Sequence, residues 1–197
     1  MTASIGIVIS TTGYPRADDV LRDADIAMYR AKAQGKARYE LFDPAMREQI
    51  MARLKLEGDL HRAVEGGELR VSYQPIVSLA CQQVNGFEAL VRWQHPEHGW
   101  LPPDSFIPLA EETGLIIPLD RWVLREVCFQ MQAWSRQFQA NPPLTVSVNI
   151  SGKQFSQPDL VEYVQFTLKE SGLNPACLKL EVTESAIIED HDGAIET

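Results

Sequence analysis

The sequence lacks the features of a membrane, secreted or disulfide-stabilised protein. No apolar run in the 197 residues reaches the ~18 residues of a membrane-spanning helix, and the start shows no basic segment followed by an apolar stretch. The three cysteines, Cys81, Cys128 and Cys177, are far apart, odd in number and without zinc-site spacing. We therefore expect reduced thiols in a cytoplasmic protein, with no membrane segment in this chain, although a longer parent protein can carry an anchor elsewhere.

Positive charge is also scarce. The chain has 18 Lys and Arg against 27 Asp and Glu, a net charge of -9. A general nucleic-acid-binding protein needs a basic face, so this partner class is disfavoured. The imbalance is uneven, because residues 1–42 hold six basic and five acidic residues whereas residues 43–197 hold twelve and twenty-two. This asymmetry indicates two regions of different origin.

Histidine is rare and shows no ligand pairing. His95 and His98 lie in a stretch rich in proline and glycine, while His61 and His191 are isolated. We expect surface histidines, and no serine in the chain has a nearby His–Asp partner that would indicate a serine hydrolase.

The pattern of apolar residues predicts alternating strands and helices. A short buried strand is expected at 3–9, then a helix that follows Asp18 or Asp19 and ends near Gly35, and a strand at 39–42. A connecting helix is expected over 43–66. The remaining expected elements are strands at 69–77, 84–93, 144–150 and 178–183, helices at 105–112, 119–138 and 158–171, and a loop at 96–103. This order predicts an α/β fold with a parallel sheet, with about half the ~250 residues of an eight-unit barrel.

Three polar residues fall near the ends of predicted strands, namely Glu88, Asn149 and Glu181. Carboxylate and amide oxygens suit Mg²⁺ or Mn²⁺ better than zinc. Glu88 and Arg92 are four apart in one strand, so their side chains share a face. Residue types alone leave two interpretations open: a metal site with a phosphate contact, or structural and surface polar groups.

The first forty residues resemble the C-terminal end of a GGDEF (diguanylate cyclase-type) domain. The resemblance is carried by residues 4–7, 24–32 and 35–36, which read SIGI, ADIAMYRAK and GK. It implies that Lys32 and Lys36 contact nucleotide phosphates. The alternative is a solvated basic surface formed with Arg30 and Arg38, because the motif that names the family is not in this chain.

Residues 57–197 closely resemble the N-terminal half of an EAL domain, the bacterial cyclic-di-GMP phosphodiesterase family. Five motifs occur in the family's order. They are YQPI at 73–76, EALVRW at 88–93, PLAEETGLI at 108–116, VNIS at 148–151 and EVTES at 181–185.

The EAL resemblance implies a modified (β/α)8 barrel that hydrolyses cyclic-di-GMP to pGpG by a two-metal mechanism with Mg²⁺ or Mn²⁺. It implies that the metal ligands are Glu88, Asn149 and Glu181. Arg92 would bind a substrate phosphate and Gln74 would contact the substrate, with a structural role for Gln74 equally open. Glu184 would steady a loop near the metals, again with a structural alternative.

Together the two resemblances predict a fragment of a tandem GGDEF–EAL signalling protein. We divide it into a GGDEF remnant at 1–42, a linker helix at 43–56 and half an EAL domain at 57–197. The family's aspartate pair, catalytic lysine and further glutamate are absent, so we expect this chain alone to be inactive. The alternative is a non-catalytic module that binds cyclic-di-GMP or a partner, and a homodimer through the EAL domain is a further implied assembly.

Overall fold

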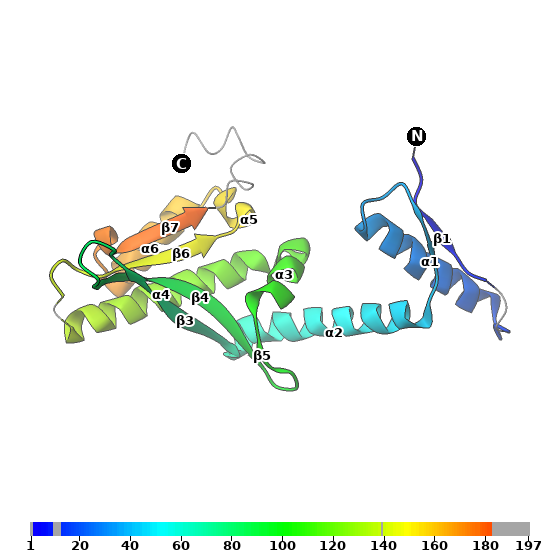
Figure 1. Cartoon of the computed structure of the whole chain (residues 1–197), viewed down its shortest axis with the longest axis horizontal. Coiled ribbons are helices and arrows are strands. Elements are labelled where there is room, and N and C mark those ends of the chain that lie inside the picture. The colour runs from blue at the N-terminus through cyan, green and yellow to red at the C-terminus, as the bar shows by residue number, and fades with distance from the viewer. Residues whose placement is uncertain (1, 10–12, 139, 183–197) are drawn as a thin grey trace. The chain divides into compact units, whose positions relative to one another are not determined.

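The computed structural model describes residues 2–9, 13–138 and 140–182, and the chain forms two compact units. The first unit comprises Met1–Gly58 and the second Asp59–Thr197. Figure 1 shows the elements of each unit. Each unit is described separately below.

The first unit contains a two-stranded parallel sheet beside one helix. β1 (Ile5–Ile7) pairs with β2 (Tyr39–Leu41), and the crossover between them is α1 (Ala17–Ala33), with acidic residues in its first turn and basic residues in its last. This charge order matches the helix dipole. The prediction of a buried first strand was wrong, because Ile5 is 53% exposed. Among the described residues, β1 has only β2 as a strand neighbour.

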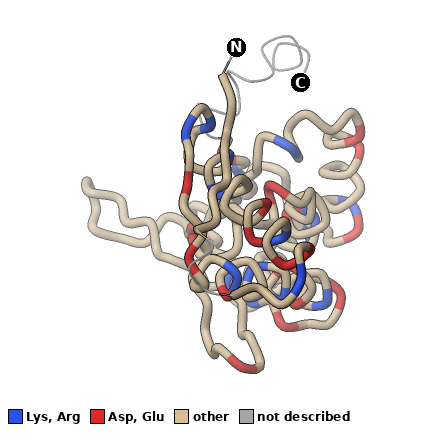
Figure 2. Tube along the Cα trace, turned by 90° about the vertical axis from the view of Figure 1, so that its right-hand side faces the viewer, with Lys and Arg blue, Asp and Glu red and all other residues tan. Residues whose placement is uncertain are grey.

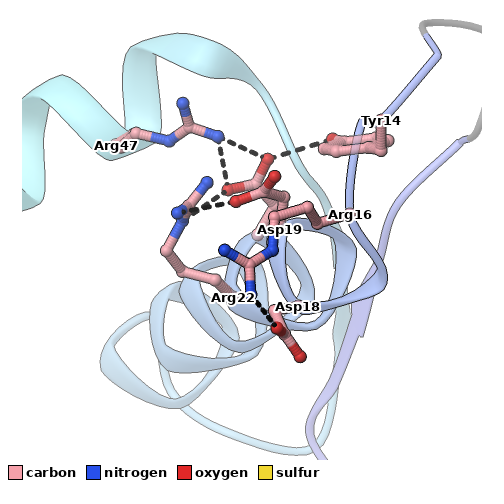
Figure 3. A network of polar contacts seen from close by, with 7 residues as sticks. Tyr14, Arg16, Asp18, Asp19, Arg22 and Arg47 are labelled. Atoms are coloured by element: carbon pink, nitrogen blue, oxygen red, sulfur yellow. Dashed lines mark hydrogen bonds and ion pairs between the residues drawn. The ribbon is translucent and has the colours of Figure 1, made fainter.

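A buried carboxylate in α1 joins this helix to the first turn of α2 (Pro44–Gly66). Asp23 is fully buried and accepts hydrogen bonds from the Arg47 guanidinium at 2.6 Å and the Tyr14 hydroxyl at 3.0 Å, with Arg22 3.6 Å away (Figure 3). Burial alone would raise the pKa of Asp23, but the bonds from Arg47 and Tyr14 outweigh it and lower the pKa. The start of α2 is therefore fixed within the first unit.

The second unit is built on a sheet with the strand order β3-β4-β6-β7. β3 (Leu69–Val77) and β4 (Val84–His95) form an antiparallel hairpin, while β6 (Thr145–Ile150) and β7 (Leu178–Val182) continue the sheet in parallel with β4. The expected all-parallel sheet is corrected at β3, because the six residues between β3 and β4 are too few for a crossover. The expected loop at 96–103 contains a short strand, β5 (Gly99–Leu101), that pairs with the end of β4.

The helices of the second unit bury one face of this sheet. Figure 1 shows α4 (Ile116–Gln137) lying along the strands, and Val123, Val127 and Met131 of α4 are buried. The strands contribute Val91, Trp93, Val146, Val148 and Ile150 to the same core. The other helical segments are η1 (Pro103–Ser105), α3 (Ile107–Thr113), α5 (Gly152–Phe155), α6 (Leu160–Ser171) and η2 (Pro175–Cys177).

The prediction that His95 lies at the surface was wrong. Its side chain is buried, and its Nδ1 accepts hydrogen bonds from the backbone N–H groups of Glu97 and His98. Nδ1 is therefore the unprotonated nitrogen, and Nε2 donates to Asp59 of α2 at 3.1 Å. Arg62 also donates to Asp59. A carboxylate buried in the second unit thus holds the end of α2 against β4.

Two leucines of α2 provide a direct test of this packing. Leu60 is fully buried, whereas Leu54 is 57% exposed. We expect Leu60→Ala to lower the free energy of unfolding by about 2–5 kcal/mol, because it removes buried methyl groups and leaves a cavity. Leu54→Ala is expected to change it by less than about 0.5 kcal/mol. Urea denaturation of the two variants measures both, and equal effects would contradict the assigned burial.

Candidate functional site

The predicted site residues of the second unit share one face of the sheet. Gln74 of β3 pairs directly with Glu88 of β4, and Asn149 of β6 pairs directly with Glu181 of β7. Glu88 is in register with Ser147, two residues before Asn149, so both pairs face the same way. This face is opposite to the one that the helices bury.

Glu88 and Asn149 are in direct contact. The Asn149 side chain donates from Nδ2 to Glu88 Oε1 at 3.1 Å. An amide that uses its nitrogen in this way leaves its oxygen available as an acceptor or a metal ligand. Glu88 is half-buried while Asn149 and Glu181 are exposed, so all three oxygen-bearing groups are accessible.

Two arginines lie farther along the same face. Arg92 follows Glu88 by four residues, is half-buried, and donates to its neighbouring Val91 carbonyl at 2.8 Å. Its direct partner across the hairpin is Arg70 of β3, which the motifs did not single out. Arg70 likewise donates to backbone carbonyls, those of Gly67 and Leu69. Two cations are therefore placed side by side on this part of the face, where an anion would be attracted.

The remaining predicted residues are not brought to this face within the described structure. Lys32 in the last turn of α1 and Lys36 just beyond it belong to the first unit, where both are exposed. Lys36 has a φ of 61°, in the left-handed region that few residues other than glycine adopt. Glu184 lies outside the described residues.

The donor set fits part of the coordination sphere of a hard divalent cation. Glu88, Asn149 and Glu181 offer two carboxylates and one amide oxygen from three adjacent strands. Mg²⁺ takes six oxygen ligands and usually keeps several waters, so three protein donors suit it. In the parts of the chain that the structure describes, no group of three His, Cys, Asp or Glu side chains is arranged to hold a metal. The set proposed here contains only two residues of those four types, Glu88 and Glu181, and its third member is the amide of Asn149.

A buried carboxylate behind this site was missed by the sequence reasoning. Asp120 of α4 is 6% exposed and accepts two hydrogen bonds from Ser151, from the hydroxyl at 2.6 Å and from the backbone N–H at 3.0 Å. Burial raises the pKa of Asp120 to about 6, although the Ser151 bonds oppose the rise. The available signal was an acidic residue on the apolar face of α4, four residues after Ile116 and three before Val123.

Lys and Arg positions are interspersed with Asp and Glu positions along the described chain (Figure 2). None of the helices in the described ranges is both long enough and apolar enough to span a membrane.

The raised pKa of Asp120 makes stability depend on pH. A carboxyl group whose pKa is higher in the folded state makes its full contribution to folding stability at pH values below its unfolded-state pKa of 3.8. This contribution is lost as the pH rises through the folded-state pKa of about 6. The difference between these pKa values corresponds to about 3 kcal/mol in total, of which about 1.5 kcal/mol falls between pH 5 and pH 8. Urea denaturation should therefore show that the free energy of unfolding of the wild type falls by about 1.5 kcal/mol between pH 5 and pH 8, relative to that of Asp120→Asn.

Because the measurement is the difference in unfolding free energy between the wild type and Asp120→Asn, the contributions of the other titrating groups cancel. Asp104→Asn, at an exposed position of η1, provides a control for which a constant difference from the wild type is expected between pH 5 and pH 8. A wild-type curve parallel to that of Asp120→Asn would show that Asp120 does not titrate in this window.

Comparison with known proteins identifies a family for each unit. Residues 57–197 match the model of the EAL domain family, and residues 1–38 match that of the diguanylate cyclase, GGDEF domain family. The chain is 40% identical over 195 residues to the bifunctional diguanylate cyclase/cyclic di-GMP phosphodiesterase MucR of Pseudomonas aeruginosa, covering 99% of this chain and 28% of that protein. It is 37% identical over 194 residues to the cyclic di-GMP phosphodiesterase PdeR of Escherichia coli, covering 98% of this chain and 29% of that protein.

A solved structure supports the same assignment. The phosphodiesterase PaMucR in its c-di-GMP complex matches with a TM-score of 0.67 and 41% identity, over 72% of this chain and 57% of that one. The confirmed fold is therefore a partial barrel of the TIM type, and the chain spans less than a third of the length of these two curated relatives. The chain belongs to the EAL domain family and carries, ahead of that domain, a fragment of a GGDEF domain.

Proposed function

We propose that this chain carries one half of the active site of a bacterial signalling phosphodiesterase, which hydrolyses cyclic-di-GMP to pGpG when the EAL domain is complete. The observation that supports this most directly is the contact between Glu88 and Asn149, with Gln74 and Glu181 paired to them on the same face. The names of MucR and PdeR and the ligand of PaMucR give the substrate class.

In this proposal Glu88, Asn149 and Glu181 hold Mg²⁺ or Mn²⁺, and two such ions when the domain is complete. The metal, when bound, activates a water and stabilises charge on the phosphoryl oxygens. Asn149 is oriented for its part by the bond from its Nδ2 to Glu88, which turns Oδ1 away from that carboxylate. Ligation would require the Glu88 carboxylate to be ionised, because a metal binds the deprotonated form of a carboxyl ligand.

The substrate is positioned by residues on the same two strands. Arg92 presents a planar cation that pairs with phosphate oxygens through two parallel N–H donors. Gln74 lies directly across the hairpin from Glu88, so an amide donor and acceptor adjoin the metal-binding carboxylate. Glu184 is assigned, by its place in the family motif, to steadying the loop near the metals.

A second function from a different class rests on one specific observation. The three ligands proposed among the described residues are fewer than a two-metal site needs. A module with this set can bind cyclic-di-GMP or a partner without hydrolysing it, as a sensor or through a homodimer of the EAL domain. The free cysteines are compatible with a cytoplasmic setting for either function.

Activity assays separate these two functions. We expect no hydrolysis of cyclic-di-GMP by this 197-residue chain with Mg²⁺ or Mn²⁺, and activity from the same chain continued through the rest of its EAL domain. Glu88→Ala in the longer protein should lower kcat by at least about a hundredfold, because one ligand of the catalytic metal is lost. Glu162→Ala, at an exposed position of α6, is the matched control and should be fully active.

Three outcomes would decide between the functions. Activity in the 197-residue chain would show that the residues beyond it are not required. Binding without hydrolysis in the longer protein would favour the sensor. Full activity of Glu88→Ala would remove the proposed metal site.

Arg92 is expected to act on substrate binding. Arg92→Ala should raise KM for cyclic-di-GMP by about tenfold or more, and Arg92→Lys should recover only part of this, because an ammonium cannot reproduce two-pronged contact. Arg136→Ala, an exposed arginine of α4 away from the site face, is the control. An unchanged KM for Arg92→Ala would show that this arginine does not contact the phosphate.

A further inference from the structure

Asp120 is an unusual residue for the interior of this domain. It is a nearly fully buried carboxylate, and within the described residues it has no ion pair with a Lys, Arg or His. A buried charge without a cation costs stability unless hydrogen bonds compensate for it. Glu111 also acts on it unfavourably by repulsion.

Both hydrogen bonds to Asp120 come from one residue, Ser151. The Ser151 hydroxyl and backbone N–H converge on Oδ2 of Asp120 at 2.6 and 3.0 Å. The same hydroxyl accepts the backbone N–H of Gln154 at 3.2 Å, as the N-cap of α5. Ser151 is therefore fixed from one side by α4 and from the other by α5.

Ser151 follows the proposed metal ligand Asn149 by two residues. Asn149 is exposed, and its side chain donates to Glu88. The direction in which an exposed side chain points also depends on the backbone that carries it. Immobilising the backbone at Ser151, just beyond the end of β6, limits how far the last residues of β6 can move.

We propose that Asp120 is a positioning residue for Asn149, acting through Ser151 to fix the end of β6 so that the Asn149 amide oxygen faces the metal site. The inference rests on the proposed function, because it takes Asn149 as a metal ligand. It assigns a role to α4, an element that carries none of the motif residues that the site uses.

The residue type supports positioning over a purely structural bond. A carboxylate forms stronger hydrogen bonds than a neutral acceptor, and one oxygen here receives two donors from the same residue. A neutral acceptor at this position would satisfy the backbone N–H without a buried charge. In other metal sites, removing a residue that holds a metal ligand in place commonly weakens metal binding by about 10–100-fold.

The test uses the parent protein with its complete EAL domain and measures Mn²⁺ binding by electron paramagnetic resonance, which reports free Mn²⁺ without any turnover. Asp120→Ala should weaken Mn²⁺ binding by about tenfold. Ser151→Ala, which keeps the backbone bond, should weaken it by about fivefold. Asp120→Asn keeps an acceptor oxygen but replaces the carboxylate with a weaker neutral acceptor, so its affinity should lie between that of Asp120→Ala and that of the wild type.

Two controls separate positioning from stability and from the proposed function. Thr167→Ala removes a buried hydroxyl that bonds within α6, so it should lower the melting temperature and leave Mn²⁺ affinity unchanged. Asn149→Ala should weaken Mn²⁺ binding at least as much as Asp120→Ala. If Asn149→Ala has no effect, the proposed metal site is wrong. If Asn149→Ala weakens binding while Asp120→Ala and Ser151→Ala bind as the wild type does, the inference is overturned.

Discussion

The site depends on how closely β6 approaches β4. Gly86 of β4 pairs with Thr145 of β6, and a Cβ added at Gly86 would lie 2.6 Å from the Thr145 carbonyl oxygen. Any larger residue would push the strands apart at the point where their pairing begins. Because the register continues from this point to Glu88 and Ser147, the absence of one side chain allows Asn149 to reach Glu88.

Buried carboxylates fix the ends of elements in both units. In the first unit, Asp23 holds the start of α2 through Arg47. In the second, Asp59 holds the end of the same helix to His95, and Asp120 holds the end of β6 through Ser151. Each contact joins residues far apart in sequence, so each becomes effective only when the chain has folded. Polar groups placed in this way define one arrangement of packed elements at a cost in stability.

The sequence predicted the positions of the helices and strands better than their pairing and their contacts. Periodicity located every long helix and strand of the second unit, since side-chain spacing records which face is buried. The direction of β3 was not predicted, because the pattern of a strand is the same in both directions and only the length of its turn distinguishes them. His95 and Asp120 were misjudged or missed because both are satisfied by residues distant in sequence, 36 and 31 positions away.

Charge is ordered along the site face, and this order explains how one surface can suit both a metal and a phosphate. Glu88 and Glu181 place carboxylates on three adjacent strands together with the Asn149 amide, whereas Arg70 and Arg92 are opposed farther along the β3–β4 hairpin. A cation is attracted to the first group and an anion to the second. Under the proposed function, a phosphodiester that bridged them would neutralise the arginines and bring its oxygens toward the metal, so each ligand would strengthen binding of the other. The strand register would set where these two groups of side chains lie relative to one another, and so the distance over which the coupling acts.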